Sequence, residues 1–167
     1  MSNTMTRHFS LVAASDGSAE SRAALHVAFD LARAIGSSAD VHVVSVVDYI
    51  SLPAGLTDAP LGAPDLLASD AETELRVASQ IAAESGLQIT TQLLRGPVAD
   101  EVLKYARAID AALIVVGTHG RSGIARALMG STCESLVRGS DIPVVTVRAS
   151  AHLDNARPDE TRSEALF

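Results

Sequence analysis

The segment from Gly117 to Thr132, GTHGRSGIARALMGST, contains the residue types that phosphate binding needs. Its glycines let backbone N–H groups turn toward a ligand and approach it closely. Gly130 and Ser131 come where a helix is expected to begin, and the free N–H groups of a helix N-terminus favour phosphate. Arg121 and Arg126 add local positive charge. The composition of the segment is equally consistent with a tight loop in which the glycines serve only the backbone.

Individual residues in and near this segment could have chemical roles, and each has an alternative. Asp16 follows a short apolar run, where it can cap the next helix or contact a ligand, and Ser18 is the other candidate for the cap. His119 can donate to a phosphate or act as a general acid, but its context fits a loop histidine near the phosphates better. Cys133 is expected in the first turn of a helix, where the pKa of a thiol can fall, or else it is a small buried residue.

The elements that would position these residues alternate along the chain. Strands are expected over 9–14, 41–47, 87–94, 111–116 and 142–148, and helices over 18–35, 65–84, 96–109 and 131–138. This alternation predicts a Rossmann-like, doubly wound α/β fold, a five-stranded parallel sheet with helices on both faces. Ligands bind beyond the carboxyl ends of the strands in such sheets. The candidate site therefore lies after the first, second and fourth strands.

Two segments outside these elements, a long loop and a C-terminal tail, complete the expected organisation of the chain. Residues 48–64 include three prolines and two glycines and are predicted to form a long loop. This loop and the second helix are interpreted as a lid over the ligand. Residues 149–167 have little periodicity and are predicted to be a flexible tail, so the expected domains are 1–148 and the tail 149–167.

Composition and charge narrow the class of protein. The 167 residues suggest one domain, and a net charge of −7 argues against a nucleic-acid partner. The single cysteine excludes an intrachain disulfide, and the longest apolar run is too short to span a bilayer. Because the N-terminus lacks the apolar stretch of a signal peptide, we expect a cytoplasmic protein without a membrane partner. The sequence has no Walker A motif, no GxSxG elbow and no zinc-ligand spacing.

The spacing Gly117-x2-Gly120-x9-Gly130-Ser131 resembles the nucleotide-binding signature of the universal stress protein family, in its ATP-binding branch. Three more segments resemble that family in the same order, with the sequences ASDGS at 14–18, SVVD at 45–48 and IPVVTV at 142–147. The resemblance covers about residues 7–148. The chain departs from the family at Ser45, where histidine is frequent, and in its C-terminal tail.

The resemblance implies a sheet with strand order 3-2-1-4-5 and a bound adenine nucleotide, which is ATP or else AMP or ADP. Mg²⁺ or Mn²⁺ would be carried by the nucleotide phosphates. Asp16 would contact the nucleoside end, the Val46 backbone would bind adenine, and Ser131 with Thr132 would cradle phosphate. The binding residues that it implies are Ala14, Ser15, Asp16, Val46, Gly117, Thr118, His119, Gly120, Arg121, Gly130, Ser131 and Thr132.

Three functional hypotheses follow from these residues and the resemblance. The first is a stress sensor or signalling module in which bound nucleotide changes either the 48–64 loop or the geometry of a homodimer formed through strand 142–148. An apolar strand at a sheet edge invites such pairing. The second is a slow ATPase or phosphotransferase, although no catalytic residue is assigned. The third is a nucleotide-free, chaperone-like scaffold dimer, and the intact glycine motif counts against it.

Overall fold

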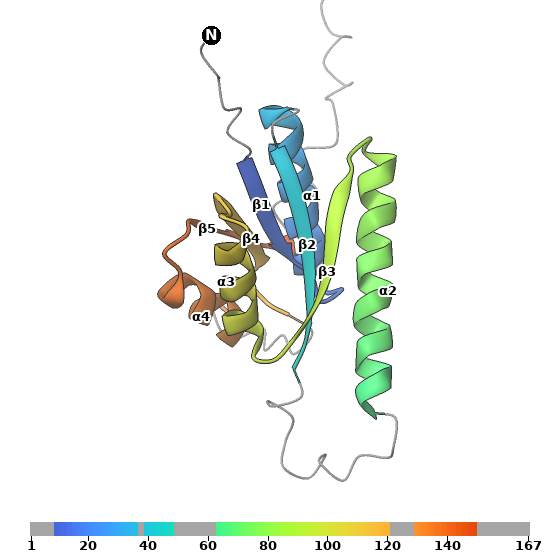
Figure 1. Ribbon diagram of the computed structural model, residues 1–167, viewed down its shortest axis with the longest axis vertical. Helices are drawn as coiled ribbons and strands as arrows, with labels where there is room; N and C mark the ends of the chain where they lie inside the picture. The colour runs from blue at the N-terminus through green and yellow to red at the C-terminus, as the bar shows by residue number, and fades with distance from the viewer. Residues whose placement is uncertain (1–8, 37–38, 49–62, 121–128, 150–167) are drawn as a thin grey trace, which may run out of the picture.

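A computed structural model describes residues 9–36, 39–48, 63–120 and 129–149 (Figure 1). The strands are β1 (Phe9–Ala14), β2 (Ala39–Val47), β3 (Ile89–Arg95), β4 (Leu113–Gly117) and β5 (Val144–Val147). The helices are α1 (Ala19–Ile35), α2 (Ala63–Glu84), α3 (Val98–Ala108) and α4 (Ser131–Gly139). Most of the predicted loop and tail, together with Arg121 and Arg126, lies outside the described residues. Among the described helices, none is both long enough and apolar enough to cross a membrane.

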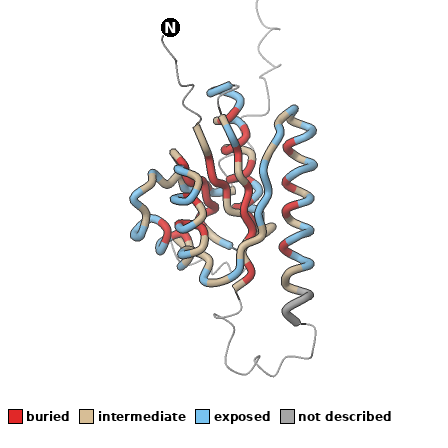
Figure 2. The backbone as a smooth tube through the Cα atoms, viewed as in Figure 1, coloured by how far each residue is buried: buried red, intermediate tan, exposed pale blue. Residues whose placement is uncertain are grey.

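The strands form one parallel sheet in the order β3-β2-β1-β4-β5, which confirms the predicted order and fold class. Successive residues of β1 point to opposite faces of this sheet. Leu11 and Ala13 pack in the core formed with α1 and α2, whereas Val12 packs in the core formed with α3 and α4. The most deeply buried residues therefore follow the central strands (Figure 2). Two helices cover each face, as a doubly wound fold requires.

Helix α1 begins and ends at residues that the sequence pattern indicates. Ser18 has extended backbone angles, and its side chain accepts a hydrogen bond from the Ser21 N–H at 3.1 Å. Ser18 is therefore the N-cap, and Asp16 is not. Gly36, with φ of 89°, ends the helix in a conformation that suits glycine. The position of the turn before α1 is thus fixed by a local cap.

Strands β3 and β4 each begin two residues later than predicted, for the same reason. The Leu87 N–H donates to the Ala82 carbonyl at 2.9 Å, and the Ala111 N–H donates to the Ala106 carbonyl at 2.9 Å. Each bond closes the C-terminus of the preceding helix around a residue of positive φ, Gly86 or Asp110. The apolar side chains at these positions belong to helix-ending turns and were wrongly assigned to strands.

The fifth strand is shorter than the predicted 142–148. The Ser140 hydroxyl donates to the Ile142 carbonyl at 2.6 Å and accepts from the Ile142 N–H at 3.0 Å. These bonds hold Ile142 in a turn, so that β5 begins at Val144 and ends at Val147. Strand β5 nevertheless lies at an edge of the sheet, as predicted.

Candidate functional site

A cavity of about 480 Å³ opens where the carboxyl ends of β1, β2 and β4 meet. These strands are neighbours in the sheet, so their ends converge at one edge. The cavity volume lies within the range of about 300–1,000 Å³ that is usual for small-molecule sites. Apolar side chains line one part of it: Ala14, Val44, Val46, Val98 and Val116. The remaining lining residues are Ser15, Asp16, Ser21, Asp48, Gly117, Thr118, His119, Gly120, Gly130, Ser131, Thr132 and Cys133.

This cavity brings together eleven of the twelve residues that the family resemblance implies. The twelfth, Arg121, lies outside the described residues. Six lining residues are not among those that the resemblance implies, and they are Ser21, Val44, Asp48, Val98, Val116 and Cys133. Asp48 is the first residue after β2, one of the three strand ends at which the sequence predicts the site, although the residue itself was not assigned a binding role. The others face the cavity through strand alternation and helix packing, which the sequence signals only as a core pattern.

Backbone hydrogen bonds fix the turns that carry these residues. The Ser15 N–H donates to the Val44 carbonyl at 2.9 Å, which ties the end of β1 to β2. The Thr118 N–H donates to the Val147 carbonyl at 2.8 Å, which ties the end of β4 to β5. The Gly130 N–H donates to the Thr118 carbonyl at 2.7 Å, so the start of α4 is held against the segment after β4. The cavity therefore has a preformed backbone frame.

Two glycines of the motif allow parts of the protein itself to approach closely. A Cβ atom on Gly117 would lie 2.8 Å from the backbone carbonyl carbon of Glu20, in the first turn of α1. A Cβ atom on Gly120 would lie 2.6 Å from Oδ2 of Asp16. A side chain on Gly117 would meet backbone that cannot move easily, whereas a side chain on Gly120 would displace the Asp16 carboxylate. The glycines of this segment therefore have a structural role in close packing, as one of the two interpretations of the sequence expected.

The N-termini of α1 and α4 both border the cavity, but their N–H groups differ in how they are satisfied. Helix α1 is capped by the Ser18 side chain. Helix α4 has Gly130 at its N-cap, and no side chain of the described residues makes a capping bond there. Because the first N–H groups of a helix have no partner within the helix, the end of α4 offers donors to a ligand. An anion in this cavity is therefore best placed at Ser131 and Thr132.

The end of the cavity at the carboxyl ends of β1 and β2 is acidic. Asp16 follows β1 and Asp48 follows β2, and both line the cavity. None of the described lining residues is a Lys or Arg. His119 also lines the cavity, and its Nδ1 atom lies 3.2 Å from the Thr118 hydroxyl. The site thus combines carboxylate acceptors at the ends of β1 and β2 with helix N–H donors at the start of α4.

With this geometry in place, the comparison with known families is decisive, because the model of the universal stress protein family matches residues 10–148. The chain belongs to that family. The chain is 32% identical over 141 residues to Universal stress protein MJ0531 of Methanocaldococcus jannaschii, covering 83% of this chain and 81% of the relative.

Solved structures of universal stress proteins resemble this chain over most of its length. One, described as a universal stress protein in complex with cAMP, has a TM-score of 0.61 and 26% identity, covering 84% of this chain and 97% of that one. Another, from Archaeoglobus fulgidus in complex with dAMP, has a TM-score of 0.62 and 23% identity, covering 86% of this chain and 99% of that one. The second likeness supports the fold alone.

In this universal stress protein, Cys133 is a small buried residue. Only 2% of its surface is exposed, and burial raises the pKa of its thiol. The alternative of a reactive thiol with a lowered pKa is therefore wrong, although the residue lies at the first turn of α4 as predicted.

Ser45, at which this universal stress protein departs from the family pattern, is buried on β2. It lines a second cavity of about 160 Å³ between the end of β2 and helix α2. The two cavities share Asp16, Val46 and Asp48. Helix α2 therefore comes close to the acidic end of the larger cavity, and it contributes Asp70 and Glu74 to the smaller one.

Proposed function

We propose that this chain binds an adenine nucleotide in the cavity of about 480 Å³, with the phosphate at the N-terminus of α4. The observation that carries the proposal is the uncapped end of this helix inside the cavity, next to the Gly130-Ser131 pair of the family motif. A helix N-terminus stabilises an anion through both its free N–H groups and its dipole. The cAMP complex of a family member 26% identical to this chain supports the same class of ligand.

The acidic end of the cavity suits the nucleoside part of such a ligand. Asp16 and Asp48 are hydrogen-bond acceptors when ionised, and adenosine has donors in its ribose hydroxyls and its exocyclic amine. The apolar side chains of Val44, Val46 and Val98 provide a surface for the base. We place the base near Val46, as the family resemblance implies, and the ribose near Asp16.

We further propose that ATP binds together with Mg²⁺ or Mn²⁺ coordinated by its phosphates. The described residues contain no group of three or more His, Cys, Asp or Glu side chains that could hold a metal ion. A triphosphate would bring several negative charges toward the carboxylates of Asp16 and Asp48. A divalent cation reduces that repulsion, because it neutralises charge directly on the phosphate oxygens.

We propose that nucleotide binding serves sensing or signalling through a homodimer. Strand β5 lies at an edge of the described sheet, so one side of its backbone has no neighbouring strand there. Pairing of this strand with its copy across a two-fold axis would satisfy that edge. In this proposal residues 1–148 form the nucleotide-binding domain.

Calorimetric titration of the chain with AMP tests the proposed binding. We expect AMP to bind more tightly than adenosine by about tenfold or more, because α4 contributes only to phosphate binding. Equal affinities for AMP and adenosine would contradict the placement of the phosphate. Absence of binding for every adenine ligand at about millimolar concentration would contradict the proposed function itself.

Titration of ATP with Mg²⁺ and then with EDTA tests the role of the metal. We expect removal of the cation to weaken ATP binding by about tenfold, and AMP binding by much less, because AMP brings less charge toward the carboxylates. AMP is the matched control, since any effect of EDTA on the protein itself is the same in both titrations. ATP affinity that is unchanged by EDTA would exclude a cation carried by its phosphates.

A further inference from the structure

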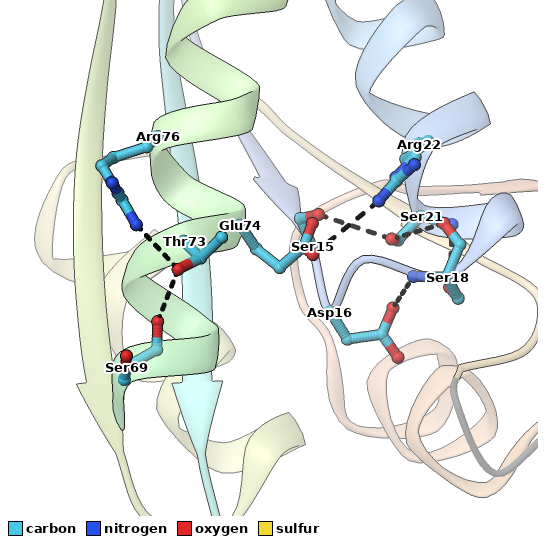
Figure 3. Close-up of polar contacts among 9 residues, drawn as sticks. All are labelled: Ser15, Asp16, Ser18, Ser21, Arg22, Ser69, Thr73, Glu74 and Arg76. Atoms are coloured by element: carbon cyan, nitrogen blue, oxygen red, sulfur yellow. Dashed lines mark hydrogen bonds and ion pairs between the residues drawn. The ribbon is translucent and has the colours of Figure 1, made fainter. Parts of the chain in front are cut away.

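The Glu74 side chain of helix α2 reaches the turn that carries Asp16 (Figure 3). Gly17 has φ of +80°, and a Cβ atom built on it would overlap the Glu74 carboxylate. The carboxylate thus occupies the space that a side chain at Gly17 would need. The close contact joins two elements that are far apart in the sequence.

The Glu74 carboxylate is also held electrostatically. Its Oε1 atom lies 3.8 Å from the Arg22 guanidinium on α1, and its side chain is only 12% exposed. The Arg22 side chain is about half exposed, so this pair contributes modestly, and the packing of the Glu74 carboxylate against Gly17 is the main restraint. The side chain therefore links α2 to both the turn and the first part of α1.

The same turn fixes Asp16. Oδ1 of Asp16 accepts a hydrogen bond from the Ser18 N–H at 3.0 Å, while Oδ2 lies against Gly120. The Ser18 hydroxyl donates to the His119 carbonyl at 3.4 Å. The turn is therefore held between the segment after β4 on one side and Glu74 on the other. A shift of the turn at Gly17 would move the adjacent Asp16 carboxylate.

We propose that Glu74 is a positioning residue for the nucleotide site, acting through the Asp16–Ser18 turn. This inference rests on the proposed function, because Asp16 is placed there at the nucleoside end of the ligand. Glu74 does not line the larger cavity, so its effect on affinity is indirect. It makes the position of α2 part of the binding site, and binding of the nucleotide in turn favours the arrangement in which α2 contacts the turn.

Substitutions at Glu74 test the proposal, with AMP as the probe. We expect Glu74→Ala to weaken AMP binding by about tenfold, and Glu74→Gln, which keeps the shape, by less. Glu72→Ala is the matched control, since Glu72 is exposed on the same helix, and we expect it to leave the affinity unchanged. Wild-type affinity in both Glu74 variants would overturn the proposal. Circular dichroism and thermal unfolding establish that each variant is folded.

A double-mutant cycle with Asp16→Ala separates positioning from a general structural role. If Glu74 acts through Asp16, then Glu74→Ala changes AMP affinity much less in the Asp16→Ala background than in the wild type. Equal and additive losses in the two backgrounds would overturn the proposal, because the carboxylate would then act independently of Asp16.

Amide exchange keeps the two proposals distinguishable. If the wild-type chain binds no adenine ligand, the proposed function fails, while exchange at the Ser18 amide still reports on the turn. Faster exchange of the Ser18 amide in Glu74→Ala than in Glu72→Ala would indicate that the contact of Glu74 with Gly17 restrains the turn. Equal exchange rates in the two variants would overturn the positioning role as well.

Discussion

Gly130→Asp is expected to weaken AMP binding by about 2 kcal/mol, or roughly thirtyfold, relative to Gly130→Asn. Gly130 is the N-cap of α4, and its φ of −72° and ψ of 156° suit any residue. A carboxylate at this position would hydrogen-bond the N–H groups that the phosphate needs and would repel the phosphate charge. The loss is expected for AMP and not for adenosine, which has no phosphate.

Asparagine is a closely matched control for this substitution. Its side chain has nearly the same shape, caps a helix about equally well and carries no charge. Both side chains meet the Thr118 carbonyl, since a Cβ on Gly130 would lie 3.2 Å from that oxygen. The steric cost therefore cancels in the comparison. Equal AMP affinities for the two variants, measured by calorimetry, would mean that the phosphate does not lie at α4.

Gly117→Val is expected to lower the free energy of unfolding by about 3 kcal/mol. Local propensity predicts the opposite, because valine is favoured over glycine in a buried parallel strand. The contact with α1 decides the sign, since a Cβ on Gly117 would lie 2.8 Å from the Glu20 carbonyl carbon and 2.9 Å from the Ser21 nitrogen. Both atoms are backbone, so relief requires α1 to move away from β4.

Denaturant unfolding at equilibrium measures this effect, with Gly139→Ala as the control. A Cβ on Gly139 would lie 3.3 Å from Cδ1 of Leu103, which is the end of a flexible side chain. The control is therefore expected to change stability by less than about 1 kcal/mol. An unfolding free energy of Gly117→Val at or above that of the wild type would show that α1 and β4 separate without cost.

The order and type of the elements could be predicted because each has a clear period. The stripe of Ala24, Leu31 and Ala32 in α1, with Ser18 before it and Gly36 after it, defines a helix from both ends. The starts of β3 and β4 could not be predicted from apolar character. Leu87 and Ala111 belong to the turns that end α2 and α3. Only the hydrogen bonds of those turns distinguish these apolar residues from the first residues of a strand.

The candidate site could be predicted wherever its residues follow a strand or begin a helix. Parallel strand ends converge, so residues after β1, β2 and β4 had to share one region of the molecule. The role of Glu74 had no such signal, because it depends on which side chain of α2 packs against a turn distant in sequence. The partners of Gly117 and Gly120 were hidden for the same reason. A glycine indicates a close approach without indicating what approaches.

The most direct test of the account is a crystal structure of this chain with AMP bound. The account predicts the phosphate oxygens within hydrogen-bond distance, about 2.7–3.2 Å, of the backbone nitrogens of Ser131 and Thr132. It also predicts the ribose beside Asp16 and the base beside Val46. A phosphate bound elsewhere, or a cavity that stays free of AMP at saturating concentration, would contradict the central claim that this cavity is a nucleotide site.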